Sequence, residues 1–281
     1  MKSFSKVLCM GIITTISISA YAGTYNKEIV LGHKDAWNSD TIGLTGTYYF
    51  GEVDDSLGPL AEASFLSPQS SVGAWTSQRT RENAPNTEKR DQSGAFGTWH
   101  SGNGLYLSAG YNKREEKIRQ PSGTVTPDGT RQWTTGTLGY YINDTTTAWV
   151  GYREWKNTTV GSSYKQTRQN VGIKHLMTLG DSHLALQAEQ FQATDNDNWD
   201  YTELETKATY YPANNIGFSV GMLDTNYKDD LAHPGWDNTE YSLGTEYFIS
   251  PTMSLGMTMN RTEWSGGNSG RSQQVALTSR F

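Results

Sequence analysis

Apolar residues alternate with polar ones in short segments along most of the chain after residue 22, and no segment there shows sustained helical periodicity. A period of two places successive side chains on opposite faces of a β-strand, so each segment predicts a strand with one apolar face. Clear examples are Leu105, Leu107, Ala109 and Tyr111, and later Ile216, Phe218, Val220 and Met222. The chain is therefore expected to be all-β.

The alternating segments number 14, with 12 as the alternative count. An even number is what a membrane barrel with both chain ends in the periplasm requires. We expect strands near residues 25–34, 41–50, 70–82, 92–100, 104–113, 131–143, 145–156, 164–179, 183–194, 201–211, 216–226, 237–249, 253–264 and 272–281.

The connections between these segments alternate between tight and long, which separates a membrane barrel from a soluble sandwich. Outer-membrane barrels have short periplasmic turns and long external loops because the chain reverses alternately on the two sides. The tight connections lie at 101–104, 143–144, 180–182, 212–215 and 250–252, and the long ones at 83–92, 112–130, 157–163, 195–200, 226–237 and 265–270.

Aromatic residues end the strands that enter the tight turns. Amphipathic rings favour the headgroup level of a bilayer, so this series predicts a periplasmic girdle of a transmembrane, antiparallel, up-and-down β-barrel in contact with outer-membrane lipids. The girdle candidates are Tyr48, Phe50, Tyr140, Tyr210, Tyr247 and Phe281.

Composition supports this fold class. Hydrophobic residues make up 35 % of the chain and the mean hydropathy is −0.64, which excludes several transmembrane helices of ~20 apolar residues. The formal charge of −6 provides no basic surface for nucleic acid. Cys9 is the only cysteine.

Residues 1–22 have the features of a secretory signal peptide. Lys2 and Lys6 precede a short apolar stretch, and the sequence Ala20-Tyr21-Ala22 is typical of a cleavage site. We expect cleavage after Ala22 and a single barrel domain over residues 23–281. Loss of the signal peptide removes Cys9, so the mature chain has no thiol for a disulfide, a metal site or a nucleophile.

Two segments resemble known families. Gln273–Phe281 resembles the last strand of bacterial outer-membrane proteins, which implies insertion by the barrel-assembly machinery. Tyr48–Phe50 followed by Asp54–Leu66 resembles the segment after the second strand in a family of general porins from Gram-negative gammaproteobacteria, which implies a diffusion channel in the cell outer membrane. We expect Asp54–Leu66 to be an ordered periplasmic connection in which Pro59 interrupts strand pairing.

Small residues occupy many positions of the parity expected to face inward, such as Gly43, Thr45 and Thr47. Such short side chains do not fill a barrel of 12 to 14 strands, so a water-filled lumen is predicted. The expected function is that of a porin for passive diffusion of small hydrophilic solutes and ions, as a monomer or a homotrimer, with no cofactor and no metal.

Charged residues at inward positions are the candidates for the pore lining, because charged walls bias solute passage. We expect a positive sector on 70–82, 145–156 and 164–179 to face carboxylates on 183–211, with the anion or cation preference open. The candidates are Arg79, Arg81, Arg114, Arg153, Arg168, Lys174, Glu189, Glu203, Glu205 and Lys207.

Two further features bear on selectivity. The connection 112–130 is the longest, and it is expected to constrict the pore if it folds inside. Trp133, Trp149 and Trp155 are expected either to stack on sugars in the lumen or to belong to the external girdle.

Two other function classes fit a barrel. One is a structural or adhesive protein. The other is a lipid hydrolase, because His100–Gly104 resembles, in altered order, the motif of the outer-membrane phospholipase. A turn of Ser, Gly and Asn needs no catalytic role, so no enzymatic activity is predicted.

Overall fold

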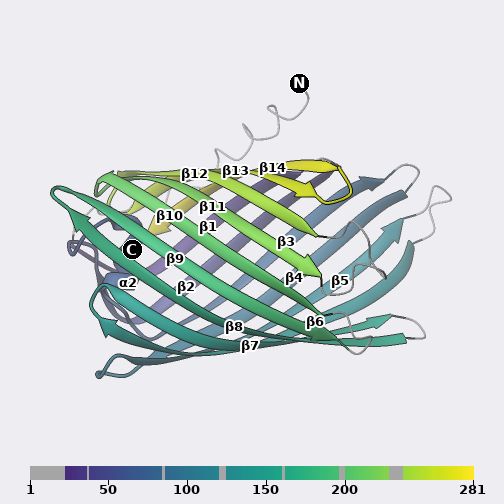
Figure 1. The fold of residues 1–281 in the computed structure, drawn as a ribbon, viewed down its shortest axis with the longest axis horizontal. Coiled ribbons are helices and arrows are strands. Elements are labelled where there is room, and N and C mark those ends of the chain that lie inside the picture. Colours follow the sequence, from purple (N-terminus) through teal and green to yellow (C-terminus); the bar gives the residue numbers. More distant parts are fainter. Residues whose placement is uncertain are drawn as a thin grey trace.

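A computed structural model describes residues 23–36, 38–83, 86–119, 125–159, 162–195, 200–227 and 237–281. The proposed signal peptide lies outside these residues. The described chain forms fourteen strands (Figure 1). They are β1 (Thr24–Ala36), β2 (Ser39–Asp54), β3 (Ser71–Asn83), β4 (Asn86–His100), β5 (Leu105–Arg119), β6 (Val125–Asn143), β7 (Thr146–Thr159), β8 (Ser162–Leu179), β9 (Ser182–Asp195), β10 (Tyr201–Ala213), β11 (Ile216–Tyr227), β12 (Asn238–Ser250), β13 (Met253–Trp264) and β14 (Ser269–Arg280).

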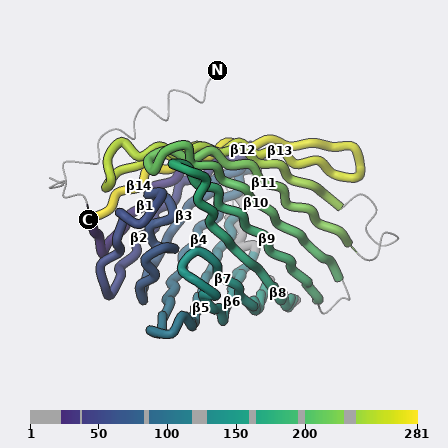
Figure 2. Tube along the Cα trace, turned by 60° about the vertical axis from the view of Figure 1, so that its left-hand side comes forward, coloured from purple at the N-terminus to yellow at the C-terminus, as the bar shows by residue number. Residues whose placement is uncertain are grey.

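Each strand pairs antiparallel with its sequence neighbours, and β1 pairs with β14 to close the barrel. Leu31 of β1 is the register partner of Leu44 on β2 and of Leu277 on β14. The C-terminal Phe281 lies beside β1, where its amide donates to the carbonyl of Lys27 at 3.1 Å (Figure 2). The predicted antiparallel barrel of 14 strands is confirmed, and the alternative of 12 is wrong.

The two ends of the barrel differ. The "turn end" carries the C-terminus and the short connections, and the "loop end" carries the ends of the long hairpins (Figure 1). At the turn end, the connection from β2 to β3 contains the short helices η2 (Leu60–Glu62) and α2 (Ala63–Leu66). No helix among the described residues is long and apolar enough to cross a membrane.

At the loop end the strands continue further than the sequence predicted. The expected long connection 112–130 is mostly a paired hairpin, because β5 runs to Arg119 and β6 begins at Val125, with Asn112 opposite Trp133. The expectation of a long unpaired connection is therefore wrong for the described part, and of the two open alternatives the described residues show no loop folded inside. Backbone ladders need no apolar alternation outside the bilayer, so these polar extensions carry no period-two signal.

Side chains alternate between an apolar outer face and a polar inner face. Leu107, Leu138 and Val150 are exposed, whereas neighbouring inward positions hold Ser108, Thr137 and Gly151 (further outer residues being Ile42, Leu44, Val171, Phe218, Val220, Leu243 and Leu255). All six girdle candidates are exposed, from 37 % for Phe281 to 66 % for Phe50.

Candidate functional site

The connection between β2 and β3 folds across the turn end of the barrel. We call its residues 55–67 the plug. Pro59, at φ −58°, directly precedes η2, and its missing N–H prevents the strand ladder from continuing there. Leu60 then donates its amide to the carbonyl of Asn214 at 2.8 Å, which ties the plug to the turn after β10.

The plug contacts strands on opposite sides of the barrel. Glu62 forms an ion pair with Lys174 of β8, and the carbonyl of Leu60 accepts a hydrogen bond from Arg280 of β14 at 2.8 Å. In a closed ring of fourteen, β8 and β14 are six strands apart one way and eight the other. A segment that touches both must therefore cross the interior.

Glu62 is the central polar anchor of the plug. Its side chain is only 8 % exposed, and it accepts a hydrogen bond from the Tyr211 hydroxyl at 2.7 Å in addition to the Lys174 ion pair. Lys174 also lies over the Phe65 ring, 4.5 Å from the centroid. A buried carboxylate needs such partners, because desolvation of an unpaired charge is costly. Lys174, a pore-lining candidate, is thus a plug contact.

Aromatic rings next to the girdle candidates turn inward and surround the plug. Tyr49, Tyr211 and Phe248 are 9 %, 4 % and 3 % exposed, although each directly follows an exposed girdle residue. Phe65 of the plug packs against Tyr141, with ring centroids 5.7 Å apart. Adjacent residues of a strand point to opposite faces, so each aromatic pair supplies one ring to either side of the wall.

Arg280 joins the plug to the seam between β1 and β14. Its Nε donates to Glu28 at 2.9 Å, and its guanidinium lies over the rings of Tyr25 and Phe248 at 4.7 and 4.9 Å. Nearby in the plug, burial raises the pKa of Asp55, while the charge of Arg280 acts in the opposite direction. The side chain of Arg280 therefore contacts both the β1–β14 seam and the plug.

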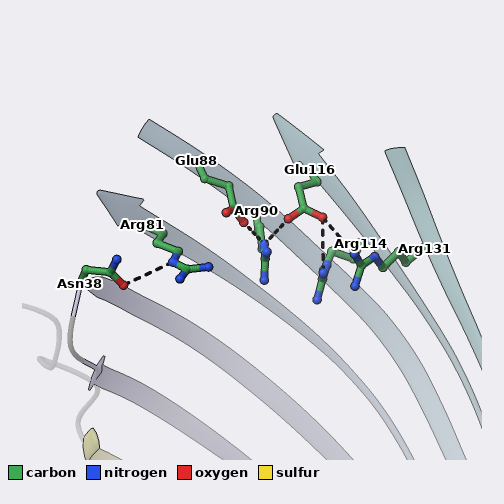
Figure 3. A network of polar contacts seen from close by, with 7 residues as sticks. All are labelled: Asn38, Arg81, Glu88, Arg90, Arg114, Glu116 and Arg131. Carbon is green, nitrogen blue, oxygen red and sulfur yellow. Dashed lines mark hydrogen bonds and ion pairs between the residues drawn. The ribbon is translucent and has the colours of Figure 1, made fainter. Parts of the chain in front are cut away.

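The loop end carries a network of arginines and two carboxylates on the inner face (Figure 3). Glu116 of β5 forms ion pairs with Arg90, with Arg114 at 3.3 Å and with Arg131 at 3.8 Å. Glu88 of β4 also pairs with Arg90. The side chain of Glu116 is 7 % exposed, so this carboxylate is the buried centre of the network.

Two further candidates lie at the edge of this network. Arg81 donates to the side-chain oxygen of Asn38 at 3.3 Å (Figure 3). Arg79 is the register partner of Arg90, and among the described residues it has no carboxylate within 4.0 Å. Five arginines thus share the region with two glutamates, which leaves a formal excess of three positive charges.

The remaining candidates lie on neighbouring strands in the middle of the barrel. Arg168 of β8 forms an ion pair with Glu203 of β10, and Arg153 of β7 is the register partner of Arg168. These groups are adjacent along the wall. The predicted positive sector on 145–156 and 164–179 therefore lies beside the carboxylates on 183–211, and not only across the lumen from them.

Glu189 accepts hydrogen bonds from Trp149 at 3.0 Å and from Asn170 at 2.5 Å. Glu205 is its register partner on β10, and Lys207 is the register partner of Gln187. Trp149 is therefore tied to the wall, whereas Trp133 and Trp155 stack on each other, with centroids 6.4 Å apart.

Sequence reasoning missed several residues of these clusters. The sequence predicts a loop around Glu116, and a loop gives no indication that Glu116 and Arg114, two residues apart, lie on the same face of a strand. The missed residues are Glu62, Glu88, Arg90, Glu116, Arg131 and Tyr211. The paired aromatics were the one available signal, because period two places the second ring of each pair inside. Within the described ranges, no group of three His, Cys, Asp or Glu residues is arranged to hold a metal ion.

Comparisons with solved structures show the same fold. The outer membrane protein Omp33 of Acinetobacter baumannii aligns over 93 % of this chain and 100 % of its own, with a TM-score of 0.59 and 19 % identity. The CymD monoaromatic hydrocarbon channel aligns over 92 % and 89 %, with a TM-score of 0.61 and 10 % identity. The toluene transporter TodX of P. putida aligns over 93 % and 91 %, with a TM-score of 0.52 and 10 % identity.

A comparison with protein-family models identifies a family as well as a fold. No curated protein matches the chain. The family model described as "Putative general bacterial porin" matches residues 1–159, which is more than half of the 281 residues. The chain is similar to outer-membrane channels in structure, and by this match it belongs to the family of general bacterial porins.

Proposed function

We propose that small hydrophilic solutes diffuse passively through the lumen of this outer-membrane porin. The inner face supports the proposal, since Ser108, Thr137 and Gly151 are short or polar where the outer face holds Leu107, Leu138 and Val150. Side chains of this size leave water-filled space in a barrel of fourteen strands. We further propose that the ten charged candidates line that space and bias which solutes pass.

The plug divides this pathway from the periplasm. Outer-membrane barrels place both chain ends and the short turns in the periplasm, so the turn end is the periplasmic mouth. A segment that contacts β8 and β14 lies across that mouth. We propose that solutes pass this mouth when the plug shifts, and that the contacts of Glu62 set how readily it does so.

Planar-bilayer recording of the purified protein in KCl tests the proposal. We expect stepwise increases in current, each step being one channel, with closures that reflect a returning plug. Correct folding of the protein is checked beforehand by its electrophoretic shift on heating. This control ensures that an absence of current is not caused by misfolded protein. A tight seal at every voltage, with folded protein inserted, contradicts the channel function.

The proposal contains no catalytic step. The ring of His100 stacks on Tyr106 with centroids 5.4 Å apart, and the Ser101 hydroxyl donates to the carbonyl of Leu105 at 2.9 Å. Both side chains thus have structural partners in a turn. Lipid hydrolysis by the wild type that disappears in His100→Ala would contradict this part of the proposal.

Maturation and assembly complete the proposal. We infer that the signal peptide is removed after Ala22, that the barrel-assembly machinery inserts the chain through the strand ending at Phe281, and that the porin is a monomer or a homotrimer. The mass of the protein extracted from outer membranes should correspond to residues 23–281. A mass that includes residues 1–22 contradicts the cleavage, and deletion of Phe281 is expected to reduce insertion.

A further inference from the structure

A small cavity in the wall of the barrel combines two guanidinium groups with aromatic rings. Its volume is about 180 Å³. Arg153 and Arg168 are register partners on β7 and β8 and both contribute to its lining. The other lining residues are Trp133, Trp155, Gln166 and Tyr201. Like charges directly opposite each other on neighbouring strands are unfavourable, so this pair needs a compensating anion.

Only one of the two arginines has that compensation within the protein. Arg168 pairs with Glu203 and lies 3.7 Å from the centroid of the Phe191 ring. Arg153 is exposed, and in the described part of the chain it has no carboxylate within 4.0 Å. The carboxylates of Glu189 and Glu203 act on Arg153 only from beyond 4.0 Å, so its guanidinium faces the cavity without a direct ion-pair partner. A carboxylate matches a guanidinium in geometry as well as charge.

Aromatic rings form the part of the lining beside the two arginines, because Trp155 lies two residues from Arg153 on β7 and pairs with Trp133 on β6. Trp133 and Trp155 stack with an interplanar angle of 14°, and the Tyr201 hydroxyl donates to Gln166 at 3.4 Å, which fixes the adjacent wall. Arg131 lies over one of the indoles, 5.4 Å from the centroid of the Trp155 ring. The indole N–H of Trp155 is buried and has no acceptor among the described residues. A planar ring suits this wall.

The excess positive charges nearer the loop end attract anions that enter the lumen from that end. The five arginines around Glu88 and Glu116 leave three positive charges in excess on the inner face. A cleft lined by one sign of charge concentrates ions of the opposite sign. An anion that enters from the loop end therefore passes this network before it reaches Arg153.

We propose that the cavity binds small organic carboxylates that carry a planar ring, the carboxylate contacting Arg153 and the ring resting on Trp133 and Trp155. This inference rests on the proposed channel function, which it deepens by naming a solute class. Binding itself requires no conduction, so a direct binding measurement separates the two. A bilayer recording without current steps would contradict the channel, whereas a titration without saturable binding would contradict the site.

The test is ligand-observed NMR titration of the folded full-length protein in detergent micelles. We expect benzoate to bind, benzyl alcohol to show no saturable binding, and acetate to bind at least about tenfold more weakly than benzoate, since it lacks the ring. Arg153→Gln should weaken benzoate binding about tenfold or more by removing one charge-assisted contact, and Arg153→Lys should weaken it less. Arg261→Gln, which alters an exposed arginine paired with Glu263, is the matched control.

The outcomes decide the matter in either direction. Glucuronate carries its carboxylate on a puckered ring, so it should bind more weakly than benzoate, and equal binding of the two would overturn the role of the planar ring. Equal affinity of benzoate for the wild type and Arg153→Gln, with both folded, overturns the proposal. Absence of saturable binding by benzoate, or equal binding of acetate and benzoate, overturns it as well.

Discussion

Glu62→Ala is expected to open the periplasmic mouth of the channel. The substitution removes the acceptor for Tyr211 and the counter-charge of Lys174, both of which hold the plug across the barrel. Loss of one partner from a buried ion pair costs about 3–5 kcal/mol. Each 1.4 kcal/mol is a factor of ten in an equilibrium, so the fraction of time in the open state should rise at least about tenfold.

Single-channel recordings in planar bilayers measure this open fraction directly. Tyr211→Phe removes a single hydrogen bond and should produce a smaller increase, so the expected order is Glu62→Ala, then Tyr211→Phe, then wild type. Glu52→Gln is the matched control, because Glu52 is exposed near the same end of β2. An open fraction of Glu62→Ala equal to that of Glu52→Gln would show that the plug contacts do not hold the mouth closed.

Glu116→Gln is expected to have the second-largest effect, at the other mouth. Glu116 is the carboxylate shared by Arg90, Arg114 and Arg131, and its neutralisation raises the local excess from three to four positive charges. Uncompensated buried charge should lower the free energy of unfolding by about 3–5 kcal/mol. The same change should shift ion preference towards chloride, because a positive wall favours anions.

Two measurements check this expectation. Urea unfolding in lipid vesicles reports the loss of stability, and the reversal potential across a KCl gradient reports the shift towards chloride. Glu115→Gln is the control one residue away. Glu115 is 47 % exposed and pairs with Lys113 at 2.8 Å, and an exposed ion pair contributes only about 0–1 kcal/mol. If both variants behave alike in both measurements, Glu116 is not the centre of the network.

The membrane-embedded part of the fold could be predicted because bilayer contact imposes a pattern on the sequence. Leu105 to Tyr111 must be apolar at every second position, and that requirement is visible without a structure. The residues from Lys113 to Arg119 carry no such requirement, since water contacts both faces beyond the bilayer. The sequence therefore predicted where β5 begins and not where it ends.

The candidate site was predictable only in part, because its contacts depend on strand register and on residues far apart in the sequence. Arg153 and Arg168 could be assigned to one face by parity, yet their being opposite each other depends on the register between β7 and β8. Glu62 lies in a helix of three residues, which is too short for any periodic signal. Its contact with Lys174, 112 positions later, exists only because the barrel closes around it.

Closure of the barrel and seating of the plug are coupled through Arg280. This residue belongs to β14, and it binds both Glu28 across the seam with β1 and the carbonyl of Leu60 in the plug. A chain whose final strand has not yet paired with β1 lacks that anchor. The pairing of β14 with β1 that closes the barrel therefore also brings into place one anchor of the plug.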